Sequence, residues 1–504
     1  MTRTLIRNAR LIGVELPTSI AIEDDRISWL GPDADADRYT GAEERIDAAG
    51  ALITPAFVDA HVHLVQTGMS LQQIDLTRAR SGRELLDLLA RYSLQRPVGN
   101  IEGWGWDDTH WPDAADLTAE AIAAAAPGRS VYLARIDGHS AVVSPDLLSL
   151  AHDHPGCDDS GRLERDAHHV VREALAKSVT DAERLNAARR ACAHLAEAGI
   201  VGFHENAAPH IGPSAELALV RQAAVEHGQH ATLYWGELIS TGAAVPEGVA
   251  GLAGDLNADG ALGSRTAALR SAYDDAEGQC GHRYLDADQI ADHVVACTRA
   301  GLQAGFHCIG DAALSEIAAG VVKAAEVVGF DALRRTRHRL EHVEMPSDSD
   351  LVIFARAGVA MSVQPAFDAL WGGPGLMYAQ RVGHRWQQMN PFRSMRQHGL
   401  VLAFGSDSPV TPIDPWAAVK AAMWHHNPEQ QLSLREAMAA HTRGGWAAAR
   451  VDDSGELRAG WRADLALWAT EYDDNGDPVI APDHPTPRLK RTISAGRTIW
   501  RESA

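Results

Sequence analysis

The sequence has few cysteines and no long apolar run, and both shortages narrow what the protein can be. Its five cysteines are scattered without a CxxC pair, which is typical of free thiols in a reducing cytoplasm. No stretch approaches the ~18 consecutive apolar residues that a membrane-spanning helix needs. The opening residues, MTRTLIRNARLIG, also lack the apolar core of a secretion signal. We therefore expect a cytoplasmic protein with no membrane partner.

Positive charge is scarce as well. The 504 residues include 46 Lys and Arg against 67 Asp and Glu, a formal net charge of −21. Because no basic cluster stands out, nucleic acid is not expected as a partner, and we attribute the acidity to solubility. The hydrophobic fraction of 45% is ordinary for a globular protein, and the length allows more than one domain.

The two ends of the chain share one pattern. In residues 1–54 and again in residues 455–504, short apolar runs are broken by Asn, Asp and Gly, as in small antiparallel sheets. Neither end has enough residues for a core of its own. We therefore predict that the two ends pair into one composite β-sandwich domain.

Between these ends, residues 55–454 alternate short apolar strands with helices that carry clear start signals. Capping boxes begin at Thr180 (TDAE) and at Ser433 (SLRE). Eight strands with intervening helices predict an α/β fold, the (β/α)8 or TIM barrel. The expected strands are residues 56–61, 200–204, 231–236, 254–258, 303–307, 338–342, 359–363 and 401–406.

One connection is too long for a loop. More than a hundred residues separate the first predicted strand from the helix near Thr180, so residues 65–178 are expected to form a subdomain inserted at the C-terminal mouth of the barrel. Within it, Trp106 and His139 are candidate substrate-binding residues. The alternative is that both belong to the core of the subdomain.

The segment FVDAHVHL, residues 57–64, ends an apolar run with two histidines. Side chains i and i+2 of a strand point the same way, so His61 and His63 lie side by side. Neutral imidazole is the commonest metal ligand in proteins. An isolated HxH pair is more often packed or exposed than metal-binding, so the rest of the chain must decide.

The other predicted strands also end in side chains that bind metals. His204 and Glu205 end the second strand, His307 the fifth and His342 the sixth, and Asp407 follows the eighth. Parallel barrel strands bring all these ends to one mouth. Only 24 of the 504 residues are histidine, so their recurrence at strand ends predicts a metal site.

In their order along the chain, these segments resemble the amidohydrolase superfamily of metal-dependent hydrolases: DAHVHL, HCIGDAA, LEH, SVQPAF and FGSDSPV. Three more are similar to its branch of YtcJ-like proteins and N-substituted formamide deformylase: GWDDTHWPD, RIDGH and ADGALGSRTAAL. The resemblance covers nearly the whole chain. It implies that His61, His63 and His307 bind metal, that His342 is a ligand or its neighbour, and that Asp407 is both ligand and proton shuttle.

The chain departs from this pattern at the fourth strand. Many relatives in the branch carry there a lysine that carbon dioxide carboxylates, whereas this chain has Asp255 in AGDLNADG. Its four lysines, at positions 177, 323, 420 and 490, are at no strand end. The aspartate reaches roughly 5 Å less far at ordinary bond lengths. Asp255 is therefore expected beside the ligands, or as a contact for a cationic part of the substrate.

With no bridging lysine, the sequence favours a single divalent ion, zinc, held by His61, His63, His307 and Asp407. A second ion held by His204 or Glu205 is left open, as is a homodimer. Arg265, in GSRTAAL, has two interpretations: it holds a substrate carboxylate, or it pairs with acidic neighbours.

The expected activity is hydrolysis of a carbon–nitrogen bond, an amide or N-formyl group, in a small molecule. The metal would activate a water, Asp407 would accept its proton, and His342 would help to polarise the carbonyl. Two rivals remain. One is a metal-dependent deaminase of a ring amine, and the other is a non-catalytic binding protein on the same fold, prompted by Asp255.

Overall fold

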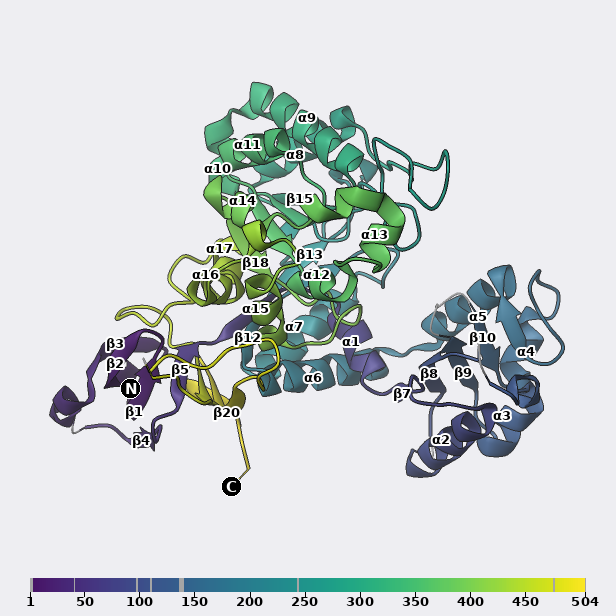
Figure 1. The fold of residues 1–504 in the computed structure, drawn as a ribbon, viewed down its shortest axis with the longest axis horizontal. Helices are drawn as coiled ribbons and strands as arrows, with labels where there is room; N and C mark the ends of the chain where they lie inside the picture. Colours follow the sequence, from purple (N-terminus) through teal and green to yellow (C-terminus); the bar gives the residue numbers. More distant parts are fainter. Residues whose placement is uncertain are drawn as a thin grey trace. The chain divides into compact units, whose positions relative to one another are not determined.

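A computed structural model describes residues 3–39, 41–96, 98–108, 111–135, 140–242, 244–474 and 476–503. It divides into two compact units (Figure 1). The main unit comprises Met1–Thr67 and Ala187–Ala504, and the insertion unit comprises Gly68–Asn186. Because the insertion unit enters just after the first strand of the barrel, that strand and the second are separated by more than a hundred residues.

The main unit contains a parallel sheet whose strands follow their sequence order. Its members are β6 (Phe57–Val62), β12 (Ile200–Ala207), β13 (His230–Trp235), β14 (Gly251–Leu252), β15 (Gln303–Cys308), β16 (Arg339–His342), β17 (Ala360–Val363) and β18 (Val401–Phe404). A parallel bridge between Val62 and Ser408 joins the two ends of the sheet. The predicted (β/α)8 barrel is confirmed.

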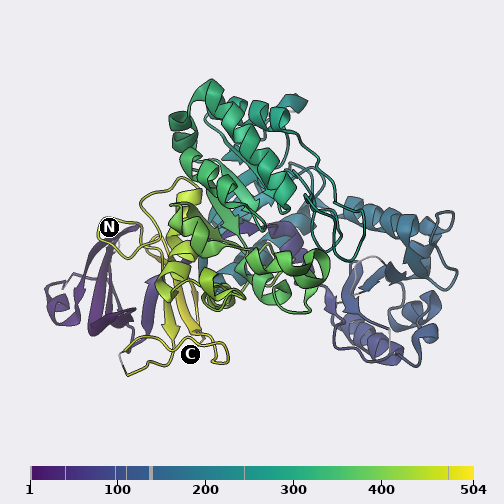
Figure 2. The same ribbon diagram turned by 45° about the horizontal axis from the view of Figure 1, so that its top comes forward.

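Helices follow the strands and cover the outside of the sheet (Figures 1 and 2). They are α1 (Leu64–Ser70), α6 (Asp181–Glu197), α7 (Glu216–Glu226), α8 (Ala287–Ala300), α9 (Asp311–Val328), α10 (Phe330–Thr336), α11 (Asp348–Ala357), α12 (Pro365–Trp371), α13 (Met377–Val382), α14 (Phe392–Gln397), α15 (Pro415–Met423), α16 (Leu434–Ala439) and α17 (Gly445–Ala448). The two expected capping boxes form, because Thr180 and Ser433 exchange hydrogen bonds with the glutamates three residues later.

The fourth barrel strand differs from the prediction. The expected strand over 254–258 is wrong, because β14 is only Gly251–Leu252, and the chain pairs with β15 again only at a single bridge from Asn257 to His307. Gly254 has a φ of +80°, a conformation that breaks an extended strand. The turn brings residue 255 inward, which matters for the metal centre below.

Strands from both ends of the chain share one sheet, in the order β21-β20-β19-β5-β1-β2-β3, with β4 on β1. They are β1 (Arg3–Leu11), β2 (Val14–Glu23), β3 (Arg26–Pro32), β4 (Glu44–Asp47), β5 (Leu52–Pro55), β19 (Leu465–Ala469), β20 (Arg488–Ser494) and β21 (Arg497–Arg501). Their core mixes the two ends, with Ile6, Ile20, Ile53, Leu465, Leu467 and Ile493. Neither end buries these side chains alone.

The insertion unit is a five-stranded sheet with helices. Its strands, in the order β11-β10-β9-β8-β7, are β7 (Ile74–Asp75), β8 (Ile101–Trp106), β9 (Val131–Arg135), β10 (Ser140–Val143) and β11 (Arg162–Glu164). Its helices are α2 (Gly82–Gln95), α3 (Ala119–Ala125), α4 (Pro145–Ala151) and α5 (Arg165–Ser178). A core of its own, with Leu85, Leu89 and Leu133, marks it as a subdomain.

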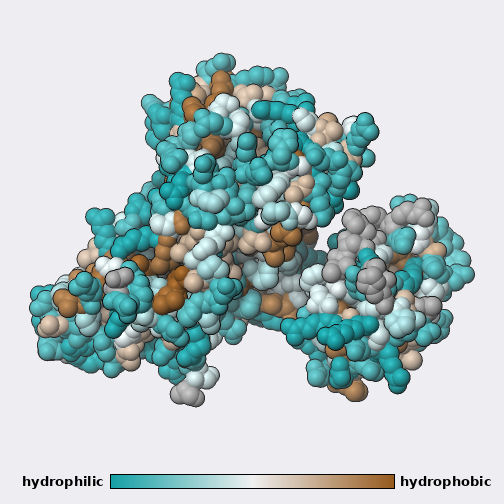
Figure 3. Space-filling view, in the orientation of Figure 1, coloured by the Kyte–Doolittle hydropathy of each residue, from teal (hydrophilic) through white to brown (hydrophobic). Residues whose placement is uncertain are grey.

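Among the helices of the described residues, none has the length and apolar character needed to cross a bilayer. The face drawn in Figure 3 is mainly hydrophilic, with hydrophobic residues in scattered groups.

Deleting residues 470–504 is expected to destabilise the main unit. The deletion removes β20 and β21 together with the buried side chains of Leu489 and Ile493. Burial of two such side chains contributes ~3–6 kcal/mol, a large part of the ~5–15 kcal/mol that stabilises a domain. Thermal denaturation should show a lower midpoint, whereas deletion of 503–504 should leave it unchanged. An unchanged midpoint for the long deletion would mean that the N-terminal strands need no C-terminal partners.

Candidate metal centre

Six side chains that can bind metals converge at the C-terminal ends of the barrel strands. They come from five strands or the residues just after them: His61, His63, Asp255, His307, His342 and Asp407. The parallel barrel explains this convergence, because each strand delivers its last side chains to the same mouth. The ligands expected from the sequence are thus brought together, and Asp255 joins them.

The tightest group is formed by His61 and His63 with two carboxylates. Nε2 of His61 lies 3.4 Å from Oδ1 of Asp255 and 3.3 Å from Oδ1 of Asp407. Nε2 of His63 lies 3.2 Å from Oδ2 of Asp255 and 3.2 Å from Oδ1 of Asp407. Ligands bound to zinc at ~2.0–2.2 Å in a tetrahedron stand roughly 3.3–3.6 Å apart. These separations suit ligands of one ion, and His61, His63 and Asp255 form a group whose ligand atoms lie within 4.8 Å of one another.

Two further histidines adjoin this group. Nδ1 of His307 lies 4.0 Å from Oδ1 of Asp255, and one ligand atom each from Asp255, His307 and His342 lie within 4.8 Å of one another. The same holds for His61, His342 and Asp407. These groups share residues with one another, so the six side chains form one cluster.

Outer hydrogen bonds fix which ring nitrogen of three histidines faces the cluster. Nδ1 of His61 lies 2.9 Å from Oε2 of Glu341. Nε2 of His307 lies 3.2 Å from the carbonyl oxygen of Gly260. Nδ1 of His342 lies 2.8 Å from Oε1 of Gln364. Oxygens of carboxylates, carbonyls and amides accept hydrogen bonds, so each of these nitrogens carries the proton. The other ring nitrogen of each histidine then presents a lone pair inward, as metal ligation requires.

Several inward atoms make no hydrogen bond. Nε2 of His61 and Oδ1 of Asp255 are buried without a hydrogen-bond partner among the described residues. A buried polar atom left unpaired is unfavourable unless something binds it. A divalent cation would satisfy both atoms, so the residues present fit a metal.

The electrostatics of the cluster also favour a cation. Burial alone would raise the pKa of Asp255 and Asp407, but the neighbouring His61 and His63 outweigh it and lower both values. In turn, the two carboxylates raise the pKa of His61 and His63 against the effect of burial. Without metal the site therefore gathers protons, and metal binding would displace them.

Glu341 and Arg339, which the sequence analysis did not identify, lie beneath the cluster inside the barrel. Both are fully buried, and the guanidinium of Arg339 donates to both carboxylate oxygens of Glu341. Burial opposes ionisation of Glu341, yet Arg339 and His61 hold the pKa of this carboxyl well below its ordinary value. Glu341 thus remains an anion that orients the His61 ring. Strand alternation could have found the pair, since 339 and 341 share one face of β16.

His204 and Glu205 take other places. Arg339 lies 2.8 Å from Nδ1 of His204, and burial followed by the charge of Arg339 lowers the pKa of this histidine far below its ordinary value. Glu205 accepts a hydrogen bond from the backbone of Leu64, and burial raises its pKa to about 7. Neither belongs to the candidate ligand groups of the described residues.

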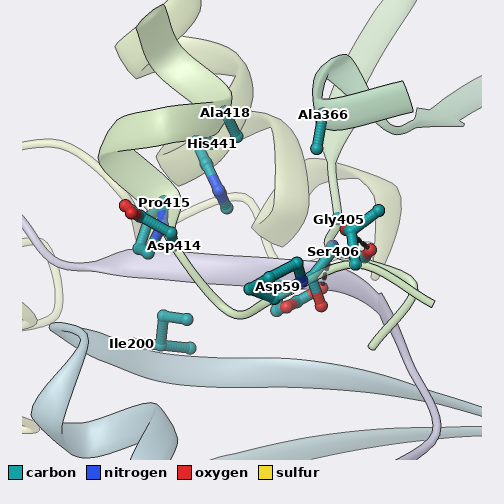
Figure 4. A pocket seen from close by; sticks show the side chains of 11 residues that line it. Asp59, Ile200, Ala366, Gly405, Ser406, Asp414, Pro415, Ala418 and His441 are labelled. Atoms are coloured by element: carbon teal, nitrogen blue, oxygen red, sulfur yellow. Dashed lines mark hydrogen bonds between the residues drawn. The ribbon is translucent and has the colours of Figure 1, made fainter. Parts of the chain in front are cut away.

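Asp59 joins the first strand to the segment after the last. Its Oδ1 accepts hydrogen bonds from the backbone N–H of His61 at 3.1 Å and of Ser406 at 2.9 Å. Figure 4 shows Asp59 beside Ser406 at a cavity of about 10 Å³, which at most suits one water. Burial raises the pKa of Asp59 to about 6. Asp59 therefore has a structural role. It joins the first strand, which carries His61, to the segment after the last strand, which carries Asp407.

The remaining predicted site residues lie elsewhere. Arg265 pairs with Asp275 at 2.8 Å, which matches its second interpretation. Trp106 is 1% exposed within the core of the insertion unit and donates to the carbonyl of Leu133, so its surroundings are those of a core residue. His139 lies outside the described residues.

A second cluster, Asp368 with His425 and His426, has a different character. Asn427 N–H donates to Nδ1 of His425 at 3.0 Å, so the proton of a neutral His425 sits on Nε2, which lies 3.3 Å from Oδ1 of Asp368. His426 also contacts this carboxylate through Nδ1. His426 therefore pairs with Asp368, whereas Nε2 of His425 has no hydrogen-bond partner among the described residues, and the three side chains form a further group that could hold a cation.

A model of the amidohydrolase family matches residues 44–500. The chain is 24% identical over 538 residues to YtcJ of Bacillus subtilis, named as an amidohydrolase, with 96% of each chain covered. It is 22% identical to N-substituted formamide deformylase of Arthrobacter pascens, with 93% of each covered. An uncharacterized metal-dependent hydrolase from Pyrococcus furiosus has a similar solved structure, with a TM-score of 0.76, 25% identity, and 92% of this chain and 98% of that one covered.

Replacing Glu341 by Gln is expected to weaken metal binding although every proposed ligand remains. The change removes the charge that orients His61 and leaves Arg339 as a buried cation without a counter-ion. Outer partners of metal ligands typically contribute ~10–100-fold to affinity, and breaking a buried ion pair costs ~3–5 kcal/mol of stability. Zinc titration and chemical denaturation measure the two effects.

The matched control for this change is Glu456→Gln, which breaks the exposed pair with Arg443. Exposed pairs contribute ~0–1 kcal/mol, so this variant should resemble the parent in both measurements. Parental zinc affinity in Glu341→Gln would show that the His61 ring needs no carboxylate behind it.

Proposed function

Because the chain belongs to the amidohydrolase family, we propose that it is a metal-dependent hydrolase that cleaves a carbon–nitrogen bond, an amide or N-formyl group, in a small molecule. The observation that carries this proposal is the buried group of imidazoles and carboxylates whose nitrogen–oxygen separations of 3.2–3.4 Å suit ligands of one cation. The named deformylase relative supports the choice of bond.

The proposed cation is zinc, held at least by His61, His63 and Asp407. Imidazole nitrogens and a carboxylate oxygen are the donor set that zinc takes in catalytic sites. Such an ion supplies Lewis acidity and brings the pKa of a water beside it to about 7. The other contributions come from the side chains of this chain.

Asp407 is the proposed base. Its carboxylate is buried, lies within 3.3 Å of both His61 and His63, and has a lowered pKa, so it is ionised at neutral pH. An ionised carboxylate at this place can take a proton from the attacking water. It can then pass the proton to the leaving nitrogen.

His342 suits a ligand better than a donor to the substrate carbonyl. Burial and the neighbouring His307 lower its pKa to about 4, so its ring is neutral at pH 7. Its Nδ1 proton is engaged by Gln364, which leaves a lone pair on Nε2. A lone pair binds a cation and cannot donate a hydrogen bond to an oxygen, so carbonyl polarisation is assigned to the metal.

Replacing His61 by Ala should remove bound metal and activity together, because the lost Nε2 contacts both carboxylates of the tight group. We expect zinc affinity to fall at least ~100-fold, more than the loss of an outer partner produces. Metal analysis of the purified variant and its turnover are the measurements. His152→Ala, which alters an exposed histidine in the insertion unit, serves as control. Full metal occupancy in His61→Ala would show that the ligand set is wrong.

Replacing Asp407 by Asn keeps the size of the side chain and one oxygen but removes the base. Turnover should fall by ~10²–10⁴-fold, the usual contribution of general base catalysis, while metal content falls less. Assays on a panel of amides, N-formyl amines and ring amines should follow amine, formate and ammonia separately. Ammonia from a ring amine alone would favour a deaminase, and unchanged turnover in Asp407→Asn would remove this residue from the mechanism.

A further inference from the structure

A second group of side chains that can bind metal lies beside two helices that follow the last two barrel strands. Asp368 is on α12, after β17, and His425 and His426 come just after α15, which follows β18. We propose that Asp368, His425 and His426 bind one divalent cation, at a site separate from the six side chains at the barrel mouth. The two sets share no residue, so this inference goes beyond the proposed hydrolysis and does not depend on it.

The three side chains meet at one carboxylate oxygen. Oδ1 of Asp368 lies 3.3 Å from Nε2 of His425 and is in direct contact with Nδ1 of His426. One ligand atom from each residue lies within 4.8 Å of the other two. Two imidazoles and a carboxylate are a donor set that zinc takes, with a further position left for water. Calcium and magnesium prefer oxygen ligands, so the donor set favours a cation such as Zn²⁺.

His425 supplies a nitrogen that the fold leaves unpaired. The residue is 2% exposed, and its Nε2 has no hydrogen-bond partner among the described residues. Although this nitrogen lies 3.3 Å from Oδ1 of Asp368, the two atoms make no hydrogen bond. A buried polar atom in this state is unfavourable unless something binds it. A cation held between the nitrogen and the carboxylate would satisfy it.

Both histidines can take the tautomer that binds metal. Nδ1 of His425 accepts the N–H of Asn427 at 3.0 Å, and it also lies 3.3 Å from the carbonyl oxygen of that residue. When a cation takes Nε2, the ring proton moves to Nδ1 and is donated to this carbonyl. Burial lowers the pKa of His425 to about 4, so the ring is neutral at pH 7, as ligation requires. Nε2 of His426 lies 3.4 Å from the carbonyl of Gln387, which leaves its Nδ1 for the cation.

A glycine keeps space free beside the group. Gly372 follows α12, and a Cβ atom there would lie 2.8 Å from Oδ1 of Asp368, 2.7 Å from the carbonyl oxygen of the same residue and 3.1 Å from Nδ1 of His426. The backbone does not itself require glycine, because φ is −88° and ψ is 108° at this position. The place of the absent side chain is therefore surrounded by two oxygens and a nitrogen, which suits a cation.

The surroundings hold the ligands in place and shield them. The backbone N–H of His426 donates to Oδ2 of Asp368 at 3.1 Å. The ring of Trp386 lies 4.6 Å from that of His426, and the ring of Phe392 lies 5.2 Å from that of His425. Fixed ligands and an apolar surrounding that limits the access of water both favour metal binding.

The proposed role of this cation is structural. It would join α12 to the chain after α15, two helices that pack against each other. The first of these helices also carries Phe367, whose ring is nearly parallel to that of His342 at a distance of 5.9 Å. Holding α12 in place would therefore steady one wall of the barrel mouth.

The experiment is titration of the metal-free full chain with Zn²⁺ alone, followed by metal analysis, in the parent and in His425→Asn. Asparagine keeps an acceptor near the place of Nδ1 and removes Nε2. We expect the parent to bind one ion more per chain than the variant, or to bind that ion at least ~100-fold more tightly, because a lost ligand should exceed the ~10–100-fold effect of an outer partner. The control is His152→Asn, the same replacement at an exposed histidine, which should match the parent.

Two further variants test the site without changing a histidine. Asp368→Asn keeps an acceptor for the N–H of His426 and removes the charge, so it should also lose this ion. In Gly372→Ala the new Cβ should occupy the place of the cation and lower the affinity for this ion by at least ~10-fold. Gly263→Ala is the matched control, since a Cβ there meets nothing within 4 Å. Thermal denaturation of each metal-free variant checks that it folds.

Each result decides one part of the proposal. Equal ion counts and affinities in the parent and in His425→Asn would overturn the site, and parental affinity in Gly372→Ala would overturn the place assigned to the cation. His61→Ala should still take up this ion when Zn²⁺ is added. If it does not, the ion belongs to the barrel mouth, which would also overturn the proposal. The titration uses no substrate, so a lack of turnover with every substrate tested would contradict the proposed hydrolase and leave these results standing.

Discussion

The candidate metal centre depends on one buried ion pair, that of Arg339 and Glu341. Both charges lie inside the barrel at 0% exposure, where taking two ions out of water costs several kcal/mol each. Good geometry offsets this: the guanidinium binds both carboxylate oxygens, donates to the carbonyl of Ala60, and lies 4.2 Å from the centre of the Tyr234 ring. A pair so fully satisfied is rigid, and it transmits that rigidity to His61.

The seam of the barrel carries the second half of the same constraint. His61 and Asp407 come from the first strand and from the segment after the last strand, which meet only when the sheet closes. Asp407 N–H donates to the carbonyl of His61 at 2.7 Å, and Asp59 bonds the backbone on both sides of the seam. Barrel closure and assembly of the ligands are therefore one event, so a chain that failed to close would also lack its metal site.

The sequence was sufficient to predict which side chains gather wherever a candidate ligand ends a regular strand. Alternation placed His61 and His63 on one face, and the parallel order of strands placed His307, His342 and Asp407 beside them. All of these rest on periodicities of two residues and on the topology of a parallel barrel. The gathering of these side chains could thus be predicted without coordinates.

Prediction from the sequence failed at the fourth strand, where the regular pairing of the backbone is interrupted. The sequence predicts a strand over 254–258, whereas β14 ends at Leu252. The actual path depends on φ at Gly254 and on contact with Gly236, eighteen residues before Gly254 in the chain. Neither a turn of this kind nor a long-range backbone contact has a periodic signature.

The net charge of the cluster has to be balanced, and this too favours a cation. The two inward carboxylates, Asp255 and Asp407, have lowered pKa values beside His61 and His63 and so bring an excess of negative charge to the cluster. Glu341 adds no net charge, because Arg339 neutralises it, so it orients His61 without competing for the cation. This negative charge must be balanced either by protons on His61 and His63 or by a metal ion. The raised pKa values of both histidines are the sign of balance by protons. A lysine at the fourth strand would need an added carboxylate to take part in this balance. An aspartate needs none, provided that the backbone carries it inward.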